Sequence, residues 1–299
     1  MHILVTNDDG VTAPGLLALV QEIRKLDAEV TVLAPDHNWS ASGHVKTMHR
    51  PMRVSETVLA DGSQAWKSDG APSDCVALAL MGVLPVKYDL VVSGINPNAN
   101  IGHDVTYSGT VTAAMEAAIG GVPGVAVSLD APEHHVGFLD FSAAASIARR
   151  IIARLLEIDY FGEKASVLNI NVPYMPEDEF KGILITRQGL RIYRDELVKR
   201  LDPRGRPYYW IGGEAPTGMH EDGTDFGALK DGYVSITPLT LDLTDHQAAE
   251  AMQGLDLGLG GVGRVGACCG SACGRCSWPG RSSGRSSSGA TCCAAAVAS

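Results

Sequence analysis

The opening of the chain constrains its fold more than any other stretch. Residues 2–6 form a short apolar run with β-branched members, and this pattern predicts a buried strand. The run ends in a polar turn that contains Asp8 and Asp9. From Pro14 onward, apolar residues recur at spacings of three and four, which predicts a helix. Strand, acidic turn and helix together indicate an α/β unit, and such units bind ligands at the carboxyl ends of their strands.

Two adjacent carboxylates at such a position repel each other unless a cation lies between them. Asp8 and Asp9 offer hard oxygen ligands, which suit magnesium or manganese better than zinc. An acidic turn before a helix is also favoured by the helix dipole alone, without any metal. On this stretch by itself both interpretations stay open.

Strands and helices alternate through most of the chain. Apolar runs predict further strands at 29–34, 52–54, 64–67, 88–93, 122–128 and 166–172, and helical spacing predicts helices that begin near 73, 111 and 141. This alternation predicts an α/β fold, a Rossmann-like doubly wound and mostly parallel sheet, up to about residue 175.

The pattern changes after residue 175. Three strands are predicted at 182–187, 207–211 and 232–237 with no helix between them, followed by a short helix at 246–252. We therefore expect antiparallel hairpins over 176–252, a β-rich C-terminal extension that mediates oligomerisation. Residues 1–252 would form one domain, with the α/β core to about residue 175 and the extension over 176–252.

Composition sets limits on location and partners. The formal charge of -10 argues against a nucleic-acid partner. The chain contains no apolar run of membrane-spanning length. Among the first 252 residues Cys75 is the only cysteine, which is typical of a reducing compartment. These features predict a cytoplasmic protein without a membrane partner.

Residues 253–299 differ in composition from the rest. They contain 11 of the 34 glycines and six of the 7 cysteines, and they are rich in serine. This stretch is predicted to be a disordered low-complexity tail, and its composition would equally fit a frameshifted end. Cys273 and Cys276 lack the further ligands of a zinc site, so the tail is expected to bind no metal.

Several polar groups are expected at one edge of the predicted sheet. Asp8 and Asp9 follow the first strand, Ser40 lies in the long loop after the second, and Asn96 follows the strand at 88–93. Together they offer an all-oxygen shell of the kind that binds magnesium or manganese.

A second group stands at the start of a predicted helix. Ser108, Gly109 and Thr110 open it, and free backbone N–H groups at such a start attract an anion. The same serine is also an ordinary helix cap. His44 and His103 are candidates for acid catalysis, and Asp104 for orienting a water molecule.

At these residues the sequence closely resembles the survival protein E (SurE) family of metal-dependent 5′-nucleotidases. The resemblance runs from Met1 to about Met252, and its motifs are VTNDDG at 5–10, APG at 13–15, APD at 34–36, SASGH at 40–44, GAPSDC at 70–75, VSGIN at 92–96, YSGTV at 107–111, TRQ at 186–188 and GYVSITP at 232–238.

The resemblance implies a set of functional expectations. The activity would be hydrolysis of nucleoside 5′-monophosphates to nucleoside and phosphate, with Asp8 and Asp9 as catalytic residues. One magnesium or manganese ion per subunit would bind the four ligands, and the protein would be a homodimer or homotetramer held partly by an exchanged C-terminal arm. The metal ligands would be Asp8, Asp9, Ser40 and Asn96, and the phosphate-binding residues Asn96, Ser108, Gly109 and Thr110.

Two positions depart from the family pattern. Asn98 stands where glycine is usual, and asparagine tolerates left-handed backbone better than most residues. Ala117 stands at another common glycine position, where we expect an effect on helix packing rather than on chemistry.

Two other functional classes remain open. A haloacid-dehalogenase-like phosphatase would use an aspartate nucleophile in an Asp-x-Asp pattern, but here the acids are adjacent and Gly10 stands at the second position. A non-enzymatic stress protein would bind nucleotide or metal without turnover. The preferred base and sugar, any activity on polyphosphate and the group that protonates the leaving oxygen are not determined.

Overall fold

The structure is a computed structural model that describes residues 1–132, 135–162, 166–253, 255 and 257. The chain divides into two units, Met1–Asp242 and Leu243–Ser299. In the second unit, α6 (His246–Met252) is the described helix. Nearly all of the predicted tail at 253–299 lies outside the described residues, so its disorder stays a prediction.

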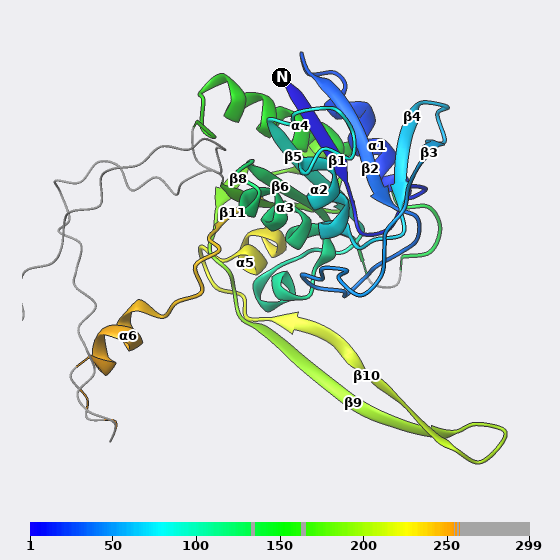
Figure 1. Ribbon diagram of the computed structural model, residues 1–299. Coiled ribbons are helices and arrows are strands. Elements are labelled where there is room, and N and C mark those ends of the chain that lie inside the picture. Colours follow the sequence, from blue (N-terminus) through cyan, green and yellow to red (C-terminus); the bar gives the residue numbers. More distant parts are fainter. Residues whose placement is uncertain (133–134, 163–165, 254, 256, 258–299) are drawn as a thin grey trace, which may run out of the picture. The chain divides into compact units, whose positions relative to one another are not determined.

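The first unit is built on a sheet whose described strands run in the order β3–β4–β2–β1–β5–β6–β7–β11–β8 (Figure 1). In chain order they are β1 (His2–Thr6), β2 (Glu29–Pro35), β3 (Val54–Val58), β4 (Gln64–Ser68), β5 (Leu90–Asn96), β6 (Gly124–Asp130), β7 (Val167–Pro173), β8 (Ile183–Ile185) and β11 (Val234–Leu239). In the sheet order, every neighbouring pair in the run β4–β2–β1–β5–β6–β7 is parallel. The predicted α/β fold with a mostly parallel sheet is therefore confirmed.

Helices cover both faces of this sheet. The helices of the unit are α1 (Pro14–Ile23), α2 (Pro72–Leu80), α3 (Gly109–Ile119), α4 (Ser142–Glu157) and α5 (Asp225–Lys230), with short 3-10 turns η1 (Gly102–Thr106) and η2 (Glu177–Glu179). Side chains of β1 alternate between the two faces, as a strand requires. Ile3 and Val5 pack in the apolar cluster that includes α1 and α4, whereas Leu4 packs with α2 and α3.

The order of the strands determines where a ligand can bind. After β1 the chain adds β2 on one side, and it later returns to place β5 on the other side of β1. This reversal is a topological switch point, where the loops after two neighbouring strands separate and leave a crevice at their carboxyl ends. Asp8 lies in the loop after β1, and Asn96 is the last residue of β5.

The C-terminal part of the unit differs in detail from the prediction. An antiparallel hairpin is present, but its first strand, β9 (Arg191–Leu201), was not predicted, and its second, β10 (Pro207–Gly218), is longer than expected. Figure 1 shows the two strands as a long ribbon. This hairpin, residues 191–218, is only part of the predicted C-terminal extension, and it alone is called the arm below. The strand predicted at 232–237 is β11, which joins the main sheet antiparallel to β7. The expectation of no helix in this region was wrong, because α5 lies between β10 and β11.

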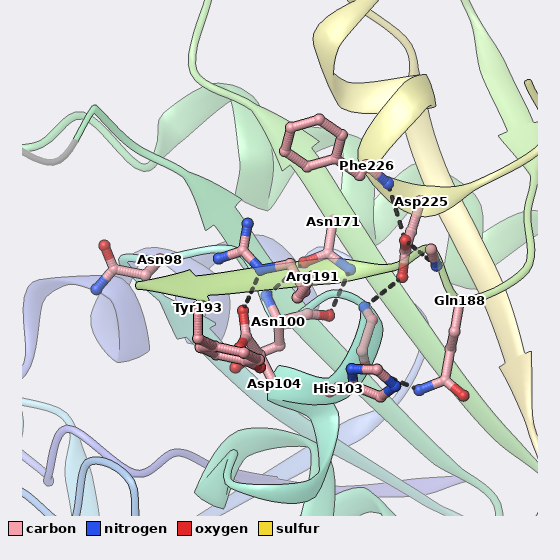
Figure 2. Close-up of polar contacts among 12 residues, drawn as sticks. Asn98, Asn100, His103, Asp104, Asn171, Gln188, Arg191, Tyr193, Asp225 and Phe226 are labelled. Atoms are coloured by element: carbon pink, nitrogen blue, oxygen red, sulfur yellow. Dashed lines mark hydrogen bonds and ion pairs between the residues drawn. The ribbon is translucent and has the colours of Figure 1, made fainter. Parts of the chain in front are cut away.

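The short helix α5 is fixed to the base of the arm by one buried carboxylate. Asp225 is fully buried, and its two oxygens accept backbone N–H groups from Gly102, Gly189 and Phe226 at 2.8, 2.7 and 2.8 Å (Figure 2). Gly102 begins η1 in the connection after β5, and Gly189 lies two residues before β9. Asp225 therefore joins three segments that are far apart in sequence.

Replacing Asp225 by alanine would leave three buried N–H groups without their acceptor. We expect Asp225→Ala to lower the free energy of unfolding by roughly 2–4 kcal/mol in denaturant titrations. The exposed Asp222, three residues earlier, provides the control. Asp222→Ala should change stability by less than about 0.5 kcal/mol. Equal effects of the two variants would contradict the assigned role of Asp225.

Candidate metal and phosphate site

Asp8 lies at the end of β1 and is only 3% exposed. The hydroxyl of Thr110 donates to Asp8 Oδ1 at 2.5 Å, and the backbone of Gly109 and Thr110 also interacts with this carboxylate. A Cβ atom at position 109 would lie 2.7 Å from the Asp8 Cβ, which is closer than atoms can pack. Glycine at 109 therefore allows the start of α3 to lie directly against Asp8.

The second acid is held close to the first. Asn38 Nδ2 donates to Asp9 Oδ1 at 3.1 Å. Burial together with the negative charge of Asp8 raises the pKa of Asp9 to about 7. Burial also raises the pKa of Asp8, although the hydrogen bond from Thr110 acts in the opposite direction. Burial and mutual repulsion make the ionised form of both carboxylates unfavourable, and a bound cation would offset this cost.

The loop after β2 brings a hydroxyl to the same place. The Trp39 backbone N–H donates to the Asp8 carbonyl at 2.8 Å, and the Ser40 N–H donates to Asn38 Oδ1 at 2.7 Å. These bonds hold the loop against the acidic turn. Ser40 thus lines the same cleft as Asp8 and Asn96.

Asn96, the last residue of β5, has an oriented amide. Its Nδ2 donates to the Asn98 carbonyl at 2.5 Å, so Oδ1 is left as the acceptor that a metal can use. The loop that follows is anchored by Asn100, whose N–H donates to Asn171 Oδ1 and whose Nδ2 donates to Ser128 Oγ, both at 2.8 Å. The ends of β6 and β7 therefore support the loop that leads from Asn96 to α3.

The donor set fits a hard divalent cation. Asp8, Ser40 and Asn96 line the cleft, whereas Asp9 is not among its lining residues and is placed beside them by its bond to Asn38 and its position next to Asp8. The set would offer two carboxylates, one hydroxyl and one amide oxygen from three neighbouring strand ends. Among the described residues no group of three or more His, Cys, Asp or Glu side chains could hold a metal. Any metal at this site would therefore need the neutral oxygens of Ser40 and Asn96 beside the carboxylates.

Three of the four residues predicted to bind phosphate lie at the start of α3, and the fourth, Asn96, ends β5. Ser108 is the helix cap, because its Oγ accepts the Val111 N–H at 3.1 Å. Asp8 already engages the Thr110 hydroxyl and the backbone of Gly109 and Thr110, and the Val111 N–H is bound to Ser108 Oγ. The Ser108 hydroxyl is left as a donor for an anion at the positive end of the helix. The structure thus brings both groups of predicted residues together, while their binding roles stay predictions.

The three candidates for proton transfer have different surroundings. His44 Nε2 pairs with Glu116 at 2.9 Å, and Lys46 contacts the other Glu116 oxygen at 2.9 Å. Burial alone would raise the pKa of Glu116, but these two partners hold it below the usual range. Asp104 lines the cleft, whereas His44 and His103 are not among its described lining residues.

Asp104 itself is engaged by the base of the arm. Arg191 Nε donates to Asp104 Oδ2 at 2.7 Å, and the Tyr193 hydroxyl donates to Oδ1 at 2.5 Å (Figure 2). Both oxygens of the carboxylate therefore have donors, which favours a positioning role for Asp104.

The cleft has a volume of about 900 Å³ and extends well beyond the predicted site. Sequence reasoning missed several of its lining residues: Asp130, Tyr174, Arg191, Phe226 and Lys230. The one signal for Asp130 in the sequence is that it stands just beyond the apolar strand predicted at 122–128, as Asp8 does beyond the first strand.

The two departures from the family pattern are accommodated. Asn98 is not among the residues with positive φ, so asparagine meets no left-handed strain there. Its side chain points away from the cluster drawn in Figure 2. Ala117 is fully buried in the apolar cluster between α2 and α3, in agreement with an effect on packing.

Comparison with known proteins decides the family. The profile of the family Survival protein SurE matches residues 3–195. The chain belongs to the SurE family. The protein named 5′-nucleotidase SurE from Herpetosiphon aurantiacus is 54% identical over 245 residues, which cover 82% of this chain and 94% of that protein. The 5′-nucleotidase SurE of Chloroflexus aggregans is 50% identical, with 85% and 98% covered.

A solved structure agrees with this assignment. The SurE protein from Aquifex aeolicus superposes with a TM-score of 0.70 at 37% identity, and the match covers 85% of this chain and 98% of that one. The fold described above is therefore the SurE fold. No helix among the described residues is long and apolar enough to cross a membrane.

The fit of the oxygen ligands predicts stabilisation by metal. Manganese at about 100 times its Kd should stabilise the protein by roughly 2.7 kcal/mol, which corresponds to a rise in Tm of roughly 5–10 °C. The measurement should be made near pH 8, above the pKa of Asp9 at about 7, because protons compete with the metal.

Asp9→Asn removes one of the two charges and should lose most of this shift in Tm. The matched control is Asp27→Asn, the same change at an exposed site outside the cleft, which should keep the full shift. An undiminished shift in Asp9→Asn would show that the metal binds elsewhere.

Proposed function

We propose that this protein is a metal-dependent 5′-nucleotidase that hydrolyses nucleoside 5′-monophosphates to nucleoside and phosphate. One magnesium or manganese ion per subunit would be held by Asp8, Asp9, Ser40 and Asn96. Relatives covering most of the chain bear the name 5′-nucleotidase SurE, which supports the proposal.

The observation that carries the proposal is the contact between Asp8 and the start of α3. Thr110 donates to Asp8 at 2.5 Å, and Gly109 allows the helix to approach the carboxylate closely. A cation held by Asp8 would therefore lie beside backbone N–H groups that favour an anion. Adjacent sites for a cation and an anion match a phosphate group bound through a metal.

The parts of the site would divide the chemistry. A bound divalent cation polarises a phosphoryl oxygen and lowers the pKa of a water molecule, so that water can attack near neutral pH. The Ser108 hydroxyl would bind another phosphoryl oxygen, and the positive end of the α3 dipole would stabilise the charge of the phosphate. Asp8 and Asp9 would serve as catalytic residues by holding the ion next to the phosphate.

The rival aspartate-nucleophile class has less support from the geometry. Its second acid would stand at position 10, where Gly10 adopts φ +98 and a Cβ atom would lie 3.2 Å from the His37 backbone. An aspartate there would be both strained and crowded. A trapped aspartyl-phosphate on this protein would nevertheless favour that class.

Phosphate release from a nucleoside monophosphate is the direct test. We expect turnover with manganese or magnesium, none with chelator, and a loss of about 10³-fold or more in kcat for Asp8→Asn. The Asp27→Asn variant should retain the wild-type rate. Nucleotide binding without any turnover would instead support the non-enzymatic class, and a rate unaffected by chelator would contradict the metal mechanism.

We also propose that the protein is a homodimer or homotetramer in which the arm contacts another copy. The arm carries large apolar side chains that are exposed in the single chain, among them Leu197, Trp210 and Ile211, the last two 63% and 83% exposed. A two-stranded ribbon with such side chains has little of its own core to stabilise it.

Charges on the arm should therefore dissociate the assembly. We expect the double change Trp210→Asp and Ile211→Asp to lower the mass measured by light scattering to that of a smaller species. The single change Val58→Asp, at an exposed position on the edge strand β3, is the control and should leave the mass unchanged. An unaltered mass in the arm variant would exclude the arm from the interface.

A reducing compartment, the cytoplasm, is proposed as the location. The buried Cys75 is a free thiol, and no other cysteine occurs before residue 253. Chains that mature in oxidising compartments use disulfides more often than this composition allows.

A further inference from the structure

The cleft continues past the metal site along the carboxyl edge of the sheet. At one end lie Asp8, Ser40 and Asn96. At the other lie Asp130, the last residue of β6, and Tyr174, which follows β7. From β1 to β7 the sheet advances by three strand spacings, about 14 Å. A phosphate at the start of α3 would leave the far end of the cleft for whatever the phosphate is attached to.

Charges at this far end balance one another. Asp130 is partly buried, and the pKa of its carboxyl is raised by burial, while Lys230 and Arg191 act in the opposite direction. Arg191 also binds Asp104 through Nε at 2.7 Å. Two carboxylates and two cations leave no net charge, so the far end is not built for a second phosphate.

The same end also offers aromatic surface. Tyr174 and Phe226 line the cleft, and Lys230 Nζ lies 5.4 Å from the centre of the Phe226 ring. Figure 2 shows Phe226 next to Asp225 in α5, and Arg191 also lines the cleft. A neutral ligand with one flat apolar face and several hydroxyl groups would satisfy such a lining.

We propose that the far end of the cleft is a nucleoside subsite, in which Asp130 accepts hydrogen bonds from the sugar hydroxyls and the base lies against Tyr174 and Phe226. This inference rests on the proposed 5′-nucleotidase function and names the residues that select its substrate. Asp130 would be a specificity residue, since it lies at the end of the cleft away from the metal ligands.

The test compares two substrates in one preparation. Adenosine 5′-monophosphate fills both ends of the cleft, whereas ethyl phosphate reaches only the metal end. For Asp130→Asn we expect the ratio of kcat/KM for the nucleotide to that for ethyl phosphate to fall about tenfold or more, mainly through KM for the nucleotide. Phe226→Leu should lower the same ratio. A misfolded variant would lose both activities together, so the ratio is compared only between variants that keep the wild-type rate with ethyl phosphate.

The matched control is Asp178→Asn, the same chemical change at an exposed position of η2 that does not line the cleft. It should keep the wild-type ratio. If Asp130→Asn and Phe226→Leu keep it too, or if wild-type protein shows no preference for the nucleotide, the subsite proposal is wrong while the nucleotidase proposal stands.

Nucleoside binding provides a readout independent of turnover. The subsite contains none of the proposed metal ligands, so adenosine should bind wild-type protein in the presence of chelator. Saturation-transfer NMR should detect this binding, and the signal should be much weaker with Asp130→Asn than with Asp178→Asn. Equal signals from the two variants would overturn the subsite even if the protein hydrolyses no phosphate ester at all.

Discussion

The repulsion between Asp8 and Asp9 is the constraint on which the rest of the site depends. Two acids in sequence, one of them 3% exposed, are held at the end of a buried strand where water cannot fully solvate them. Their surroundings reduce this cost only in part, through Thr110 and Asn38. A divalent cation would remove it, and the start of α3 would then lie beside that cation rather than beside a bare carboxylate.

The sheet topology explains why the ligands converge. Reversal of strand order between β1 and β5 opens the crevice, and the loop after β2 brings Ser40 to it. The far wall comes from a different part of the chain, namely α5 and the base of the arm. Asp225 and Asp104 connect that wall to the segment after β5. The bond between Arg191, the first residue of the arm, and Asp104 therefore links the arm directly to the cleft.

The parts of this fold that were predictable from sequence share strong local patterns. The strand that ends at Asp8 and the helix that follows it needed only periodicity and turn chemistry, and the capping serine of α3 was recognisable from its helix. The helix α5 has only six residues, too few for a periodic pattern. The strand β9 alternates little, because most of its side chains are exposed. Arg191 was missed for that reason, since its relevance comes from tertiary contact with Asp104.

Anomalous diffraction at the manganese edge, from crystals soaked with manganese, tests the central claim most directly. The account predicts one strong peak per subunit, within coordination distance of oxygens from Asp8, Asp9, Ser40 and Asn96, and beside the first turn of α3. No peak at this position, or a peak that leaves the two aspartates without a cation between them, would contradict it.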